Sequence, residues 1–262
     1  MASLLLAPPR GGGDLDLGLK GRTAIVGGAS AGIGLACAEA LAGEGANVAL
    51  LARGRNALER QAERLGALAV PGDAARAEDL ERLVAETLGR FGGIDVLVLN
   101  SGGPPRVCAV DVTDEQVEEA VALLLLSAVR LVRLCRPHLE ASGRGRVIAI
   151  TSSAVKEPVD GLALSNAVRP GLTGWLKSLA RELGPTGVTV NAVAPGRIDT
   201  ARMREVYGDA GPSAADLAAI PLRRLGTAKE LGDVVCFLAS DQAAYVTGTT
   251  IVVDGGLTRG LL

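Results

Sequence analysis

Short apolar runs, many of them β-branched, alternate along the chain with longer segments in which apolar residues recur every three or four positions. The first pattern predicts buried strands and the second predicts amphipathic helices. The expected strands cover residues 23–26, 47–51, 68–71, 96–99, 146–151, 188–193 and 250–253. The expected helices cover residues 32–45, 56–65, 77–91, 114–139, 169–183 and 229–239.

Strands and helices that alternate with short connections are typical of a parallel sheet with helices on both faces. We therefore expect an α/β fold, a Rossmann-type doubly wound parallel sheet, in a single domain over residues 19–262. Residues 1–18 are rich in glycine and proline, and their apolar run is too short for a signal peptide, so this leader is expected to be flexible. In such sheets ligands bind beyond the carboxyl ends of the strands.

Composition narrows the classes of function. Of the 262 residues, 48% are hydrophobic and 2% aromatic, and the net charge is -2. Without a basic stripe or aromatic stacking platforms, nucleic acid is not an expected partner, and no run reaches the roughly 18 apolar residues of a membrane span. The four cysteines are far apart and there is one histidine, so we expect reduced thiols, a cytoplasmic protein and no metal site.

A glycine-rich loop follows the first expected strand and leads straight into a helix. Its sequence is Gly27-Gly28-Ala29-Ser30-Ala31-Gly32-Ile33-Gly34. Glycine lets the backbone pass close to a pyrophosphate, and the helix N-terminus offers N–H donors to it. A tight turn without a ligand is the alternative, but the position in the first βαβ unit favours a dinucleotide bound by Gly28, Ser30, Gly32, Ile33 and Gly34.

The end of the second expected strand indicates which dinucleotide. An acidic residue often binds the adenosine ribose there, but this chain has Arg53 and Arg55 instead. Guanidinium groups suit a 2′-phosphate, so the sequence predicts NADP(H) rather than NAD(H), with Arg53 at the phosphate. The alternative is that both arginines merely solvate a helix start.

Further segments carry a resemblance to a known family. They are Gly28–Gly34, Gly72-Asp73, Asn100–Gly103, Lys177–Leu183, Val188–Gly196, Tyr245–Gly248 and Val253–Gly256. Over residues 19–257 the chain resembles the short-chain dehydrogenases/reductases, and among them the 3-oxoacyl-carrier-protein reductases. The resemblance implies that Asp73 and Asn100 contact adenosine, and that the nicotinamide side of the cofactor site includes Gly102, Arg169, Pro195, Gly196, Ile198 and Thr200.

The catalytic positions depart from the family, whose members carry Asn, Ser and Tyr-x-x-x-Lys. Alignment through Lys177 places Ser165 at the tyrosine position and Arg169 at the lysine position. Leu124 stands where the asparagine belongs. The family's serine is Ser152 by its spacing to Ser165, or Ser153 by the Ser-Ser pattern, and both remain candidates.

These substitutions change the expected chemistry. A serine hydroxyl is a much weaker acid than a phenol, so Ser165 can orient a carbonyl by a hydrogen bond but is poorly matched to proton transfer. Arg169 keeps its proton, and it can stabilise an oxyanion by charge. Because Pro170 suits a first helical turn, Arg169 is expected near a helix start; alternatively, Ser165 and Arg169 only cap and solvate that helix.

We expect an NADP(H)-dependent reductase or dehydrogenase of a small-molecule carbonyl substrate, 3-oxoacyl reductase-like, with non-standard catalytic residues. The alternatives are a cofactor-binding protein without redox activity, and elimination or isomerisation in the same cleft. Tyr207 falls in the segment that forms the substrate lid in relatives. Segment 114–139 is apolar around most of its circumference, which predicts a second cover and a homotetramer.

Overall fold

Seven parallel strands form the centre of the computed structural model, which describes residues 15–208 and 211–261, without the side chains of residues 202, 205 and 206. The strands are β1 (Thr23–Gly27), β2 (Asn47–Ala52), β3 (Leu68–Pro71), β4 (Val96–Leu99), β5 (Arg146–Ile150), β6 (Thr189–Pro195) and β9 (Thr250–Val253). Their spatial order is β3-β2-β1-β4-β5-β6-β9, and every neighbouring pair is parallel. The predicted doubly wound fold is therefore confirmed, with its switch point between β1 and β4.

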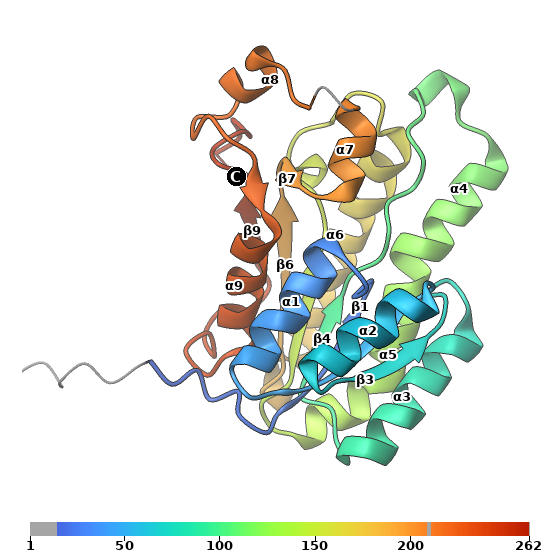
Figure 1. The fold of residues 1–262 in the computed structure, drawn as a ribbon. Coiled ribbons are helices and arrows are strands. Elements are labelled where there is room, and N and C mark those ends of the chain that lie inside the picture. The colour runs from blue at the N-terminus through green and yellow to red at the C-terminus, as the bar shows by residue number, and fades with distance from the viewer. Residues whose placement is uncertain (1–14, 209–210, 262) are drawn as a thin grey trace, which may run out of the picture.

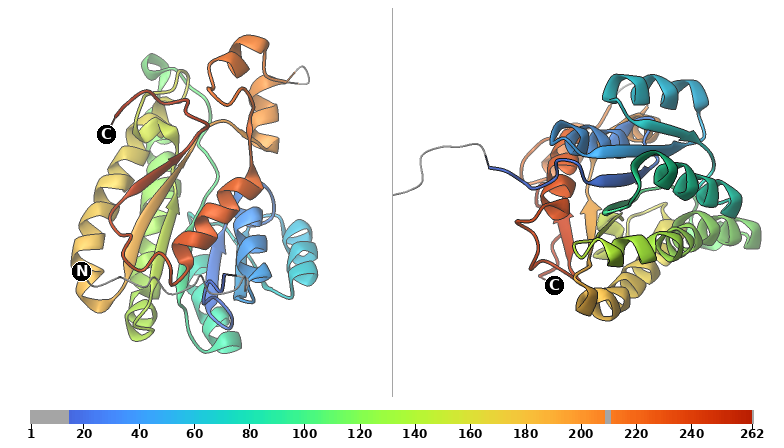
Figure 2. Two further views of the ribbon diagram at one scale, coloured as in Figure 1. Left: turned by 90° about the vertical axis from the view of Figure 1, so that its left-hand side faces the viewer. Right: turned by 90° about the horizontal axis from the view of Figure 1, so that it is seen from below.

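Helices cover both faces of this sheet (Figures 1 and 2). One face packs against α1 (Gly32–Gly43), α2 (Arg55–Leu65) and α9 (Ala228–Ala239). The other packs against α3 (Ala77–Phe91), α5 (Ser127–Ala141) and α6 (Ala163–Leu183). The central strands are buried on both sides, which explains why they read as continuous apolar runs. None of the helices that the structure describes is long and apolar enough to cross a membrane.

The predicted helix over residues 169–183 starts six residues too late, because α6 begins at Ala163. Pro170 lies inside the helix, although proline removes one backbone hydrogen bond. Tertiary packing outweighs that loss, since Leu164 and Val168 are buried against Ala120 and Leu124. The expectation that Arg169 sits near a helix start is thus wrong.

The predicted helix 114–139 is observed as three consecutive helical segments. They are α4 (Asp114–Val121), a π-helical turn (Ala122–Leu126) and α5. The turn allows Leu124 to point into the molecule, where it is buried, while Leu126 remains exposed. Such π turns often mark functional regions.

Elements that the sequence pattern did not reveal lie beyond the carboxyl ends of the strands. They are α7 (Ala201–Tyr207), α8 (Ala214–Ala218) and a small parallel pair, β7 (Ile198–Asp199) with β8 (Gly226–Thr227). Figure 1 shows them above the carboxyl ends of the strands, where the glycine-rich loop between β1 and α1 (the phosphate loop) also lies. These segments are too short for a clear periodicity. Of them, α7 falls in the segment expected to form a lid, and that role stays a prediction.

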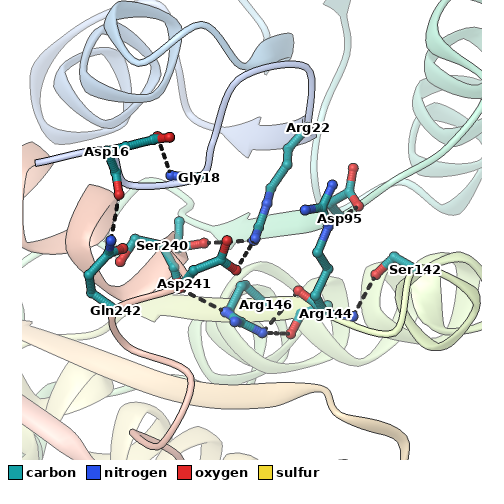
Figure 3. Close-up of polar contacts among 12 residues, drawn as sticks. Asp16, Gly18, Arg22, Asp95, Ser142, Arg144, Arg146, Ser240, Asp241 and Gln242 are labelled. Carbon is teal, nitrogen blue, oxygen red and sulfur yellow. Dashed lines mark hydrogen bonds and ion pairs between the residues drawn. The ribbon is translucent and has the colours of Figure 1, made fainter.

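Two buried arginines lie at the opposite end of the sheet, where the strands begin (Figure 3). Arg22 donates to the carbonyl of Ala239 at 3.2 Å and forms an ion pair with Asp241. Arg146 donates to the carbonyl of Ser240 at 3.4 Å. Positive charge at a helix C-terminus is favourable, so these contacts fix the end of α9 to the starts of β1 and β5.

The expected flexible leader falls mostly outside the described residues. Of residues 1–18, the structure describes 15–18, and there the carbonyl of Leu17 accepts a hydrogen bond from Asp241 at 3.1 Å. The carbonyl of Asp16 accepts another from the side chain of Gln242. The division at residue 18 stays a prediction.

Candidate cofactor and substrate site

The loop between β1 and α1 is packed too tightly for side chains. A Cβ atom at Gly27 would lie 2.3 Å from the carbonyl oxygen of Asn100, and one at Gly34 would lie 2.3 Å from that of Gly28. Gly28 also has φ +59°, a conformation that favours glycine. Within the described chain, the first turn of α1 carries no side-chain cap and no acidic residue. The loop therefore fits a pyrophosphate, whose oxygens would accept hydrogen bonds from the backbone N–H groups at the start of α1.

Asn100 and Asp73 lie at the same edge of the sheet but are engaged with the protein. The Asn100 side chain donates to the carbonyl of Gly27 at 3.0 Å, so it braces the phosphate loop. One carboxylate oxygen of Asp73 accepts from the backbone N–H of Ala75 at 2.9 Å. Their predicted contacts with adenosine stay predictions.

Arg53 and Arg55 differ in their surroundings. Arg55 forms an exposed ion pair with Glu59 at 3.2 Å. Arg53 is exposed just beyond β2 and has no ion pair with any residue that the structure describes. Arg53 is consequently the better candidate for an added phosphate.

The predicted nicotinamide side is formed by the residues after β6. Thr200 caps α7, and its methyl carbon lies 3.6 Å from the Cβ position of Gly32, so the fold brings these two candidates together. A Cβ at Gly196 would lie 2.5 Å from Cβ of Asp254. Pro195 ends β6 and Ile198 is buried in β7, whereas Gly102 lies in an exposed loop.

Ser165 and Arg169 are joined inside α6. Arg169 donates from Nε to the Ser165 hydroxyl oxygen at 3.0 Å and from Nη1 to the carbonyl of Ile150, also at 3.0 Å. The residues are only 6% and 9% exposed. The last carbonyl of β5 thus orients the guanidinium, a contact that no feature of the sequence indicated. The alternative that both residues only cap and solvate a helix start does not fit their burial.

The two serine candidates after β5 differ in burial. Ser152 is half-buried, and its hydroxyl accepts from the N–H of Ala154 at 3.1 Å. Ser153 is buried and starts a single 3₁₀ turn. Both lie close in sequence to Ile150, which anchors Arg169.

A cavity of about 30 Å³ is lined by Asn100, Leu124, Ser127 and Arg169 together with neighbouring apolar residues. Such a volume holds a water molecule. It lies between Leu124, the residue expected at the asparagine position, and the Arg169 guanidinium.

A larger cavity of about 340 Å³ borders α7 and is lined by Met203, Arg204, Tyr207, Pro212 and others. Burial raises the pKa of Tyr207, and the nearby charges of Arg197 and Arg106 oppose that shift. The phenol therefore stays protonated and can donate a hydrogen bond. The sequence pointed to Tyr207 but not to the two arginines, because only the fold brings them to it.

Three comparisons connect this geometry to known sequences. The family described as Enoyl-(Acyl carrier protein) reductase matches residues 28–258. The 3-oxoacyl-[acyl-carrier-protein] reductase FabG of Escherichia coli is 38% identical over 247 residues, covering 92% of this chain and 99% of that protein. The rabbit Dehydrogenase/reductase SDR family member 4 is 35% identical over 244 residues, covering 91% of this chain and 94% of its own length.

Solved structures show the same fold. The L-sorbose reductase of Gluconobacter frateurii, crystallised with NADPH and L-sorbose, has a TM-score of 0.86 and 32% identity, and the match covers 94% of this chain and all of that one. YwfH, an NADPH-dependent reductase involved in bacilysin biosynthesis, has a TM-score of 0.87 and 25% identity, with 92% and 99% of the two chains covered.

Proposed function

This chain belongs to the short-chain dehydrogenase/reductase family, and we propose that it reduces a small carbonyl compound with NADPH through Ser165 and Arg169. The family assignment makes it an oxidoreductase acting on CH–OH or C=O groups with NAD(P)H. The preference for NADPH, the role of the altered residues and the substrate are the proposal. The observation that carries it is the buried hydrogen bond between Ser165 and Arg169.

The phosphate loop and Arg53 support the choice of cofactor. The loop glycines let the backbone come close to a bound anion. Arg53 is exposed at the end of β2, where the adenosine ribose is expected, and its guanidinium has no ion pair with a described residue. Of the two similar structures, YwfH is an NADPH-dependent reductase and the L-sorbose reductase was crystallised with NADPH. When bound, NADPH supplies a hydride to the carbonyl carbon. Asp73, Asn100, Gly102, Pro195, Gly196, Ile198 and Thr200 complete the proposed cofactor site.

Ser165 orients the carbonyl oxygen. Its oxygen accepts from Arg169, and its hydroxyl hydrogen has no acceptor among the described residues, so it can point to a substrate. The adjacent guanidinium stabilises negative charge as it develops on that oxygen, and burial strengthens this effect. Ser152 or Ser153 supplies a second donor. Because arginine does not release its proton, water or the substrate itself supplies the proton.

A panel of ketones and oxo esters tests the proposal through the loss of NADPH absorbance. Turnover that is faster with NADPH than with NADH supports it. Binding of NADPH without turnover would favour a cofactor-binding protein. Conversion of a substrate without loss of NADPH would favour elimination or isomerisation.

We also propose that the protein is a cytoplasmic homotetramer. Four free cysteines fit a reducing compartment. Leu126 is 37% exposed and Tyr245 is completely exposed, while β9 pairs only with β6 in the described chain. A second copy would cover these features. Light scattering should give about four times the chain mass of 26.6 kDa, and a mass of one chain would refute the assembly.

A further inference from the structure

Arg106 lies near the N-terminal end of α6, the helix that carries Ser165. It belongs to the loop between β4 and α4, and the next residue, Val107, forms a bridge with Leu162. The N–H of Val107 donates to Gly161 at 3.0 Å. Because Leu162 directly precedes α6, this bridge fixes Arg106 beside the helix end that carries Ser165.

The charge of Arg106 is not balanced by a carboxylate. Its side chain is exposed and donates to the backbone carbonyl of Asp160 at 3.3 Å, and it has no ion pair with any described residue. Glu157, on the loop before α6, accepts instead from the backbone N–H groups of Arg259 and Gly260. The Asp160 carboxylate forms no ion pair with Arg106 either, so several guanidinium donors remain available.

Tyr207 at the end of α7 is the second residue of interest. Tyr207 lines the cavity of about 340 Å³, and its phenol feels the charges of both Arg197 and Arg106. Arg197 is balanced by Asp216 at 3.0 Å. The protonated phenol of Tyr207 thus lies within electrostatic reach of Arg106, whose guanidinium packs at Asp160 and Gly161 and has no ion pair with a described residue.

We propose that the substrate carries a carboxylate besides its carbonyl group, and that Arg106 recognises this carboxylate with help from Tyr207. A guanidinium matches the two oxygens of a carboxylate, and a phenol adds a third hydrogen bond. This inference rests on the proposed function, because it names the class of carbonyl compound that would be reduced.

Matched pairs of substrates test it: acetoacetate and levulinate, each against its methyl ester. Wild-type protein should favour the acids in kcat/KM, and Arg106→Gln should reduce that preference about tenfold, mainly through KM. Arg106→Lys should retain part of it, and added salt should weaken it. The control is Arg181→Gln, an exposed arginine about 24 Å along α6 from Ser165.

The outcomes separate this inference from the proposed function. Equal turnover of acids and esters, unchanged in Arg106→Gln, overturns the inference and leaves the reductase in place. If neither is turned over, the reductase proposal fails, and calorimetry with the NADPH-bound protein decides the inference. Levulinate binding that is lost in Arg106→Gln supports it, whereas binding that is absent or unchanged overturns it.

Discussion

The Nε atom of Arg169 donates a hydrogen bond to the hydroxyl oxygen of Ser165, one helical turn away on α6 and 3.0 Å distant. The same guanidinium is held by the carbonyl of Ile150 at the end of β5. Two candidate catalytic residues thus form one buried unit. The unit joins the sheet edge to the helix that borders the cleft.

Replacing Ser165 should affect the chemical step. Ser165→Ala removes the proposed donor to the carbonyl oxygen, so we expect kcat to fall about a hundredfold, with unchanged NADPH affinity. Steady-state kinetics and a fluorescence titration of NADPH measure the two effects. Ser178→Ala is the matched control, since Ser178 is an exposed serine on α6. Wild-type kcat in Ser165→Ala would show that this hydroxyl has no catalytic role.

Arg53 should determine the choice between the two nucleotides. Arg53→Ala removes the free guanidinium at the end of β2, and we expect NADPH affinity to fall about tenfold or more. NADH affinity should change little. Arg55→Ala serves as the control, because Arg55 is already paired with Glu59. Equal losses for the two nucleotides, or none, would refute a 2′-phosphate site at Arg53.

The ion pair between buried Arg22 and half-exposed Asp241, at the amino ends of the strands, should show an asymmetry in stability. Asp241→Ala leaves the fully buried Arg22 without its carboxylate, and because solvent reaches Asp241 and Arg22 keeps the carbonyl of Ala239, the free energy of unfolding should fall by about 1–2 kcal/mol. The double variant Arg22→Met/Asp241→Ala removes the buried charge as well and should be more stable than Asp241→Ala. Urea denaturation compares them, with Glu59→Ala as an exposed control expected to cost below about 1 kcal/mol. A double variant less stable than Asp241→Ala would contradict this account.

Thiol chemistry should single out one cysteine. Burial raises the pKa of Cys37 and Cys135 to about 12 and that of Cys236 to about 11, whereas Cys108 is exposed. Ellman's reagent at neutral pH should therefore modify Cys108 rapidly and the other three only after unfolding. Rapid modification of Cys37 or Cys135 in the native protein would contradict the tight packing of α1 or α5 against the sheet.

The sequence predicted the strands well for a physical reason. The apolar run Val96–Leu99 is buried on both faces. Short continuous apolar runs are typical of strands in a parallel sheet that helices cover on both sides. The glycine loop was also recognisable, because close backbone contacts such as that of Gly27 with Asn100 tolerate only glycine.

Features that depend on tertiary contacts were not predictable. Pro170 suggested a helix start, but the packing of Leu164 and Val168 extends α6 to Ala163. The hydrogen bond from Arg169 to Ile150 joins residues 19 positions apart. The β-bridge between Val107 and Leu162 places Arg106 beside the start of α6. No local pattern encodes either contact.

Transfer of deuterium from labelled NADPH tests the central claim most directly. NADPH in which deuterium replaces both hydrogens at the reactive carbon of its nicotinamide is incubated with the protein and a substrate from the panel, and the product is analysed by mass spectrometry. The account predicts an alcohol that carries one deuterium, formed more slowly by Ser165→Ala. Tight NADPH binding with no labelled alcohol from any carbonyl compound, or a product without deuterium, would contradict it.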